Sequence, residues 1–105
     1  MKTSKEDLEK LLDGYRGELV TLILKRIPSA QIYLFGSRAR KTYREGADID
    51  VAILADEKIP RSVIYALRDD IDDARIPVEV DLVDLFEADP RLLDEVKRDG
   101  VEWTN

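Results

Sequence analysis

The chain has 105 residues and a net charge of −6 at pH 7, an excess of acid that argues against direct nucleic-acid binding and would suit a basic protein partner. With 44% hydrophobic residues it can form one core, so we expect a single domain over 1–105. It has no cysteine and no histidine, which excludes disulfides, thiolate metal sites and an imidazole general base, and leaves carboxylates as the main metal-binding side chains.

Helical spacing dominates the first part of the chain. Ser4, with Asp7 three positions later, is typical of a capping box, and apolar residues follow at helical spacing until Pro28 ends the pattern. These residues are Leu8, Leu11, Leu12, Tyr15, Leu19, Leu22 and Ile23. Gly14 and Gly17 interrupt the pattern, which therefore predicts either one weakened helix or two helices joined between them. The leucines are expected in the core, with a role in an interface as the alternative.

Two strands are predicted in the middle of the chain. The run QIYLF (31–35) is rich in strand formers, and the pair Gly36-Ser37 then breaks it and opens a short helix through 38–43. The run DIDVAIL (48–54) alternates its isoleucines and valine with aspartates and alanine. A period of two is the mark of a strand, so a second strand is expected there.

Prolines mark the start of the later elements. Pro60 opens a helix that carries the acidic run DDIDD mainly opposite its apolar side, Pro77 starts the strand PVEVDLVDL, and Pro90 begins a helix that Gly100 closes. The residues 101–105 are expected to be a tail. The order helix, strand, strand, helix, strand, helix predicts an α/β domain (α+β in detail), with a short mixed sheet flanked by helices.

Three aspartates are expected to converge on this sheet. Side chains two positions apart on a strand point to the same face, so Asp48 and Asp50 project together. On the next strand, Asp81 occupies one of the alternate positions that face the polar side. The three carboxylates therefore meet if these two strands are neighbours in register. Because such a cluster repels itself, a hard divalent cation such as Mg²⁺ is its natural counter-charge.

The Gly36-Ser37 turn supplies a second half to this site. Free backbone N–H groups at a strand-to-helix turn can hold a phosphate, Gly36 lets the phosphate come close, and Ser37 adds a hydroxyl donor. A phosphate-binding turn beside metal-binding carboxylates indicates phosphoryl or nucleotidyl transfer from a Mg²⁺-nucleotide.

Each feature also has an ordinary explanation. A lone D-x-D strand usually carries polar residues on a solvent-facing surface, a lone Gly-Ser is usually only a turn, and Asp81 could pair with Arg75 or face water. The joint spacing favours the functional interpretation, because independent surface residues have no reason to follow one another in this order.

Three short motifs together resemble the three-part signature of the DNA polymerase beta-like nucleotidyltransferase superfamily. In chain order they are Phe35-Gly36-Ser37, Asp48-Ile49-Asp50-Val51 and Val80-Asp81-Leu82. The stretch GSRARKTYREGADIDVAI and the short chain narrow the resemblance to the minimal nucleotidyltransferases (MNT or MntA-like proteins) of bacteria and archaea. The likeness covers roughly residues 20–104 and includes the end VKRDGVEW, which is similar to the family's closing segment.

The resemblance implies a role for each matching residue. Asp48 and Asp50 would bind the metals, with two Mg²⁺ ions expected. Asp81 would complete the metal site and act as, or position, the general base for the incoming hydroxyl. Gly36 and Ser37 would hold the triphosphate of ATP, the expected substrate.

Four further positions bear on the match. Arg38 and Arg40 correspond to a basic pair beside the family's active site and would contact the nucleotide or a partner, with ordinary solvated arginines as the alternative. Lys41 stands where a glycine often occurs and Ala47 where a serine often precedes the first aspartate, so the loop conformation and one hydroxyl contact differ from the commonest form.

The resemblance also implies a partner. Members of the family usually occur beside a helical HEPN-domain toxin, typically an RNase, and are similar to enzymes that transfer AMP from ATP to a tyrosine of that toxin. We therefore expect an antitoxin of this kind in a hetero-oligomer, with a homodimer left open.

Other functions are compatible with some of these features. Neutralisation of the toxin by binding alone is one alternative, and nucleotidyl transfer to a small molecule is another, although the chain offers no second domain for a substrate pocket. A glycosyltransferase D-x-D is weaker, because such enzymes are much larger and the Gly-Ser turn would be unexplained.

Localisation and origin are indicated only by composition. The start MKTSKEDLEKLL lacks the apolar core of a signal peptide and no run approaches membrane-spanning length, so we expect a cytoplasmic protein. Many charges and only two amide side chains, Gln31 and Asn105, are similar to the composition of thermophile proteins.

Overall fold

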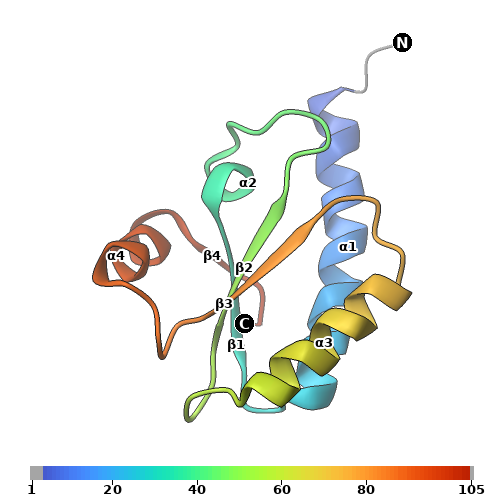
Figure 1. The fold of residues 1–105 in the computed structure, drawn as a ribbon. Helices are drawn as coiled ribbons and strands as arrows, with labels where there is room; N and C mark the ends of the chain where they lie inside the picture. The colour runs from blue at the N-terminus through green and yellow to red at the C-terminus, as the bar shows by residue number, and fades with distance from the viewer. Residues whose placement is uncertain (1–3, 105) are drawn as a thin grey trace.

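The predicted helices and strands are present in the computed structural model, which describes residues 4–104 (Figure 1). In chain order the elements are α1 (Lys5–Arg26), β1 (Gln31–Phe35), α2 (Gly36–Arg40), β2 (Ile49–Leu54), α3 (Arg61–Asp73), β3 (Val80–Asp84), α4 (Pro90–Asp99) and β4 (Val101–Glu102). The strands form one mixed sheet in the order β3, β2, β1, β4. The expected class, a short mixed sheet flanked by helices, is confirmed.

α1 is one continuous helix of 22 residues and not two. Its start is capped as predicted, because the Asp7 N–H donates to the Ser4 hydroxyl at 3.1 Å. A Cβ on Gly14 or Gly17 would meet no atom within 4 Å, so the glycines face open space while the opposite side of the helix is buried. The buried residues of α1 are Leu12, Leu19 and Ile23. Leu11, also expected in the core, is 49% exposed.

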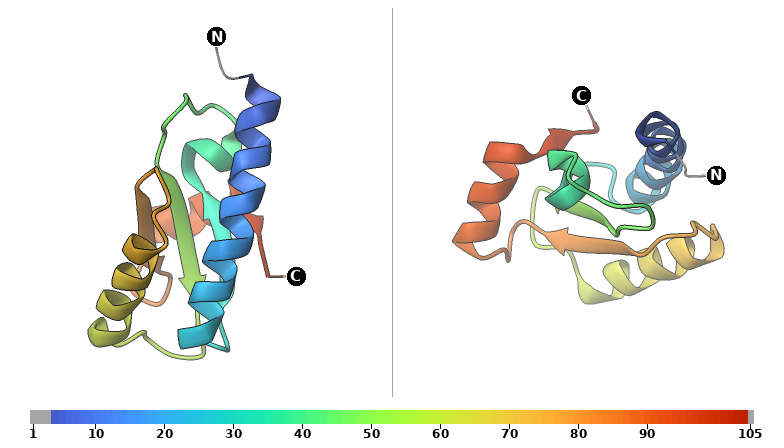
Figure 2. Two further views of the ribbon diagram at one scale, coloured as in Figure 1. Left: turned by 90° about the vertical axis from the view of Figure 1, so that its right-hand side faces the viewer. Right: turned by 90° about the horizontal axis from the view of Figure 1, so that it is seen from above.

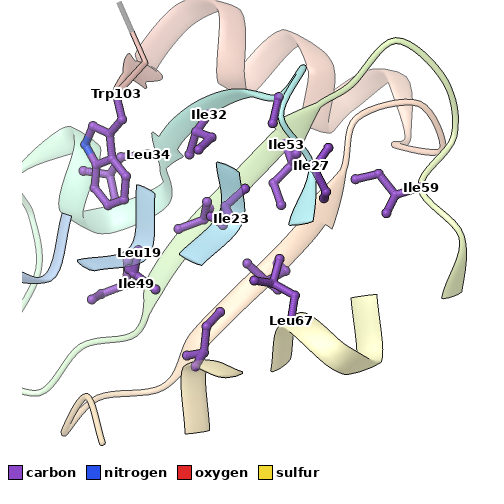
Figure 3. Close-up of a cluster of buried hydrophobic side chains, with 14 of the residues drawn as sticks. Leu19, Ile23, Ile27, Ile32, Leu34, Ile49, Ile53, Ile59, Leu67 and Trp103 are labelled. Atoms are coloured by element: carbon purple, nitrogen blue, oxygen red, sulfur yellow. The ribbon is translucent and has the colours of Figure 1, made fainter. Parts of the chain in front are cut away.

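The two faces of the sheet are covered by different helices. Ile49, Val51 and Ile53 of β2 are fully buried in the cluster that includes residues of α1 and α3, whereas Ala52 and Leu54 pack in a second cluster with residues of α4. Figure 1 shows α4 on one side of the sheet and α1 and α3 on the other. Figure 3 shows the larger cluster, with Leu19 and Ile23 from α1, Leu67 from α3 and Trp103 near the end of the chain. The even-numbered residues of β2 therefore belong to the α4 face.

The pairing of the strands brings distant aspartates together. β2 and β3 are parallel neighbours joined by α3, the crossover that a parallel pair requires, and Asp50 lies directly opposite Asp81. β1 runs antiparallel to β2, with Phe35 opposite Asp50. The condition for Asp50 and Asp81 to meet, that their strands are neighbours in register, is thus fulfilled.

The expected tail at 101–105 is wrong for residues 101–104, which pair with the sheet, and Asn105 lies outside the described residues. Residues Val101 and Glu102 form β4, which pairs antiparallel with β1, and the Trp103 N–H continues the pairing by donating to the Ile32 carbonyl at 2.7 Å. Trp103 is only 6% exposed. Two strand residues are too few to show a period in the sequence, so the pattern could not reveal this strand. Within 4–104, no helix is both long and apolar enough to span a membrane.

Candidate active site

The aspartates of the D-x-D pair lie in different surroundings. Asp50 is in β2, half-buried on the α4 face, at the end of the sheet where β1 passes into α2 (Figure 1). Asp48 lies in the loop just before β2 and is exposed, although the sequence pattern placed it within the strand. Asp81 in β3 is exposed beside Asp50. The cost of burying charge therefore falls on Asp50 alone.

The electrostatics of the site centre on Asp50. Burial raises the pKa of this carboxyl first, and the negative charges of Asp81, Asp48 and Glu95 raise it further. A hydrogen bond between the carboxyls of Asp50 and Asp81 acts in the same direction. Each of these contributions disfavours the ionised form, and a bound cation would relieve all of them together. Asp81 makes no ion pair with Arg75 among the described residues, so of its two ordinary explanations only exposure to water remains.

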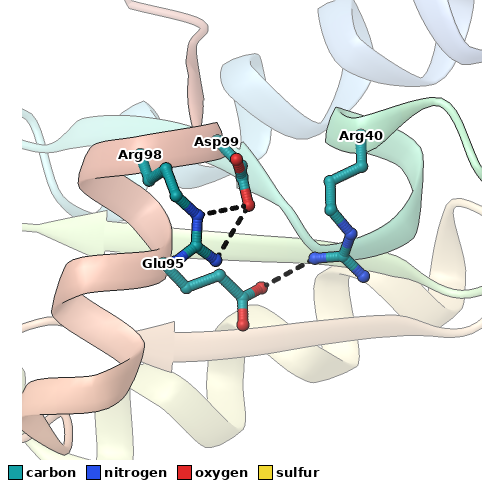
Figure 4. A network of polar contacts seen from close by, with 4 residues as sticks. All are labelled: Arg40, Glu95, Arg98 and Asp99. Carbon is teal, nitrogen blue, oxygen red and sulfur yellow. Dashed lines mark hydrogen bonds and ion pairs between the residues drawn. The ribbon is translucent and has the colours of Figure 1, made fainter.

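Glu95 belongs to this site although the sequence did not single it out. It lies on α4, and its Oε2 accepts from Arg40 Nη1 at 3.3 Å, which links the end of α2 to α4 (Figure 4). Figure 4 also shows Arg98, on the same helix, paired with Asp99. In the sequence, Glu95 has no feature that distinguishes it from the other polar residues of an amphipathic helix. Only the packing of α4 brings it near Asp50.

Gly36 lies against the carboxylate of Asp50. A Cβ at position 36 would overlap Asp50 Oδ2, and Gly36 has a φ of +74°, a backbone conformation that side chains disfavour. Position 36 therefore requires glycine for two independent reasons. The predicted neighbourhood of the Gly-Ser turn and the D-x-D pair is observed, because the first residue of α2 touches the second aspartate.

Ser37 and the turn after it close α2. The Ser37 carbonyl accepts from the Thr42 N–H at 3.0 Å, and the helix ends after five residues, at Arg40, earlier than the run 38–43 predicted. Ser37 is partly buried beside Gly36. Its contact with a triphosphate stays a prediction, and its position on the turn next to Asp50 is compatible with it.

Arg38 has a structural contact that the sequence did not predict. It is only 4% exposed, its Nε and Nη2 donate to the Ala47 carbonyl at 3.1 and 2.7 Å, and its guanidinium lies 4.8 Å from the centre of the Tyr43 ring. It is thus not a solvated arginine. The side chain fixes the loop that carries Asp48, and a direct contact with nucleotide stays a prediction.

The two departures from the commonest family pattern have simple structural outcomes. Lys41 has a φ of +62°, which explains why glycine suits this position, and its carbonyl accepts from Lys5 Nζ at 2.7 Å. Ala47 holds Arg38 through its main-chain oxygen, so this contact does not depend on the side chain at position 47. Both residues are therefore compatible with the turn after α2 and with the contact between Arg38 and the loop.

The chemistry of the carboxylates fits a hard divalent cation, while their arrangement is incomplete. Within residues 4–104, no three acidic side chains are grouped as a ready-made metal site. Asp50 and Asp81 are adjacent, and their mutual repulsion is the kind that a cation offsets. Ligation of Mg²⁺ by Asp48, Asp50 and Asp81 therefore stays a prediction.

Comparison with known proteins identifies the family. Residues 19–103 match the family described as polymerase beta, nucleotidyltransferase. The chain belongs to this family. The matched range contains β2 and β3, which carry Asp50 and Asp81, together with the Gly36 turn and α4. It therefore covers the whole site described above.

Individual relatives are similar over most of the chain. The protein adenylyltransferase MntA of Shewanella oneidensis is 34% identical over 84 residues, which are 79% of this chain and 60% of that protein. A toxin-antitoxin crystal structure with AMP-PNP is 31% identical, covers 84% of this chain and 71% of the other, and has a TM-score of 0.73. A complex of a tri-AMPylated Shewanella oneidensis HEPN toxin with its MNT antitoxin is 30% identical, covers 84% and 67% of the two chains, and has a TM-score of 0.67. The chain spans about three fifths of the curated relative.

Proposed function

We propose that this protein is a Mg²⁺-dependent nucleotidyltransferase that transfers AMP from ATP to a tyrosine hydroxyl of a HEPN toxin, and so acts as the antitoxin of the pair. The observation that carries the proposal is the contact of Gly36 with Asp50 directly opposite Asp81, which joins a phosphate-binding turn to paired carboxylates. The similarity to an adenylyltransferase and to an antitoxin complexed with an AMPylated toxin supports this choice of substrates.

The residues of the site take distinct roles in this reaction. The N–H groups of the Gly36-Ser37 turn and the Ser37 hydroxyl hold the triphosphate, as donors at a turn can. Asp48, Asp50 and Asp81 would hold Mg²⁺, which when bound neutralises triphosphate charge and polarises the α-phosphate. Glu95 holds Arg40 at the edge of the site.

The transfer itself exchanges one bond at the α-phosphorus for another. The acceptor oxygen forms a bond to the α-phosphorus while the bond between that phosphorus and the bridging oxygen of the β-phosphate breaks, and pyrophosphate leaves. The proton of the acceptor hydroxyl passes to the carboxylate of Asp81. The exposed position of Asp81 on the outermost strand allows an acceptor to approach it from solvent.

Mass spectrometry of the partner tests the proposal. The protein is incubated with Mg²⁺-ATP and the toxin encoded beside it, and the toxin is expected to gain the mass of AMP on tyrosine. Asp48→Asn and Asp81→Asn are expected to lower the rate by about 10²-fold or more, whereas Glu57→Gln, an exposed acid in the loop after β2, leaves it unchanged. A toxin of unaltered mass, or equal modification by Asp48→Asn, contradicts the proposal.

Neutralisation by binding alone is the second candidate, and one observation favours it. The acidic side chains of 4–104 form no ready-made metal group. The double variant Asp48→Asn, Asp50→Asn separates the two functions in cells that express the toxin. Protection that survives in the double variant favours binding alone, and loss of protection with a variant that still binds the toxin favours catalysis.

A further inference from the structure

β3 has a free edge next to the site. It is the outermost strand of the sheet, with β2 as its only strand neighbour within the described residues (Figure 2). The Glu79 carbonyl accepts from the Ile49 N–H at 2.8 Å, and the Leu85 N–H donates to the Ile53 carbonyl at 2.9 Å, so the odd-numbered residues of this strand direct their main-chain groups toward β2. Because these directions alternate along a strand, Val80 and Leu82 point their N–H and C=O groups outward.

A groove of about 560 Å³ lies at the start of this edge. It is bounded by the last turns of α3, the 76–79 segment and the start of β3, and one of its lining residues is Asp81. The apolar part of its lining is formed by Ile71, Ile76, Pro77, Val78 and Val80. A chain that occupies the groove therefore lies along the start of β3, next to Asp81.

The charge of the groove indicates what it binds. Among its lining residues, Asp72, Glu79 and Asp81 are acidic and exposed, and Arg68 is the only basic one. Asp72 belongs to the DDIDD run of α3, which the proposed chemistry does not use. An excess of acidic over basic side chains favours a positively charged ligand and disfavours a nucleic acid or an acidic peptide.

We propose that this groove is the acceptor-binding site, and that it takes an extended, basic segment of the protein partner as an added strand along β3. The proposal rests on the function proposed above. Main-chain bonds to Val80 and Leu82 would supply affinity without requiring a particular sequence, and the acidic lining would select arginine or lysine beside the acceptor. A side chain of the added strand that stands opposite Asp81 points to the same face, which places its hydroxyl at the catalytic carboxylates.

The charge selection is tested with two synthetic peptides of eight residues. Each has one tyrosine among valines, flanked by arginines in the first and by glutamates in the second, and AMP transfer to each is measured at saturating Mg²⁺-ATP. The basic peptide is expected to have a kcat/KM roughly tenfold higher or more. The double variant Asp72→Lys, Glu79→Lys is expected to remove this preference, while Glu57→Lys, at the other end of the sheet, keeps it. Equal rates for the two peptides, or a preference unchanged in the double variant, overturns the proposal.

The strand pairing has a readout that does not depend on activity. In the ¹⁵N-labelled protein, the amides of Val80 and Leu82 are expected to shift and to exchange more slowly with solvent when the basic peptide is added, while the amide of Val51 in the middle of the sheet is unchanged. Unaltered Val80 and Leu82 amides together with transfer to the peptide would overturn the groove and leave the enzyme standing. Protection of these amides with no transfer to either peptide or to the toxin would support the groove and contradict the proposed activity.

Discussion

Gly36 and Asp50 are packed so closely that residue 36 has no room for a Cβ atom, which would overlap Asp50 Oδ2. One residue begins α2 and the other lies in β2, so the contact joins two elements on the α4 face of the sheet. The position of the turn therefore depends on the position of the carboxylate, and a change in either moves both.

Gly36→Ala is expected to abolish nucleotidyl transfer and to destabilise the fold, because it combines an unfavourable positive φ with a steric overlap. Gly46→Ala is the matched control: Gly46 has a φ of +80° but a Cβ there would meet no atom within 4 Å, so it should cost only the backbone strain of about 1 kcal/mol. Thermal unfolding and AMP transfer are measured for both. Two variants with equal stability and equal activity would contradict the packing described here.

Asp50→Asn is expected to raise the stability of the metal-free protein at neutral pH. Because the folded state raises the pKa of Asp50 above its ordinary value of 3.8, the folded protein holds this proton more tightly, and the free energy of unfolding falls as pH rises from that value through the folded pKa. The asparagine variant does not lose stability in this way, so its Tm should exceed that of the wild type at pH 7. The difference in Tm should disappear below about pH 4.

The measurement is a series of melting curves between pH 3.5 and pH 8 in EDTA, repeated with Mg²⁺. The cation should raise the Tm of the wild type more than that of Asp50→Asn, since it offsets a repulsion that the variant no longer has. A variant less stable than the wild type at pH 7 without metal would show that Asp50 is not disfavoured in its charged form.

Arg38→Met tests whether this arginine holds the loop or the nucleotide. Loss of two charged hydrogen bonds to the Ala47 carbonyl should lower the unfolding free energy by about 2 kcal/mol, and disorder of the Asp48 loop should lower kcat. Arg40→Met is the comparison, because its ion pair with Glu95 is partly exposed and should cost less than about 1 kcal/mol. An Arg38 variant of normal stability with a raised KM for ATP would assign the residue to nucleotide binding instead.

Lys41→Gly is expected to stabilise the protein by about 0.5–1 kcal/mol, because Lys41 occupies a left-handed conformation that glycine adopts without strain. Arg75→Gly, at the other non-glycine residue with a positive φ in the described chain, should act in the same direction. Urea unfolding at constant m-value measures both. A Lys41→Gly variant that is less stable would mean that contacts of the lysine side chain outweigh the backbone strain.

The sequence predicted those parts of the site that depend on strand parity and spacing. The period of two gave the parity of Asp50 and of Asp81, but that they share a face depended on the condition that β2 and β3 are neighbours in register, which the structure fulfils. Gly36 could be placed near them because a strand leads directly into its turn. Glu95 and the buried contacts of Arg38 could not be predicted, since they depend on how α4 and the loop before Asp48 pack in three dimensions. β4 was missed because two residues are too few to show a period. Whether the glycine-interrupted segment forms one helix or two was ambiguous, because the burial of the face of α1 opposite the glycines keeps it one helix and the sequence does not show that burial.

The pairing of β4 places the only tryptophan of the chain, Trp103, in the main core behind the sheet, on the face opposite the carboxylates. Its fluorescence will therefore report the unfolding of the whole domain and will be nearly silent to nucleotide at Gly36 or to a peptide along β3. Intrinsic emission and ligand binding can thus be followed as separate signals in one sample, without an engineered probe.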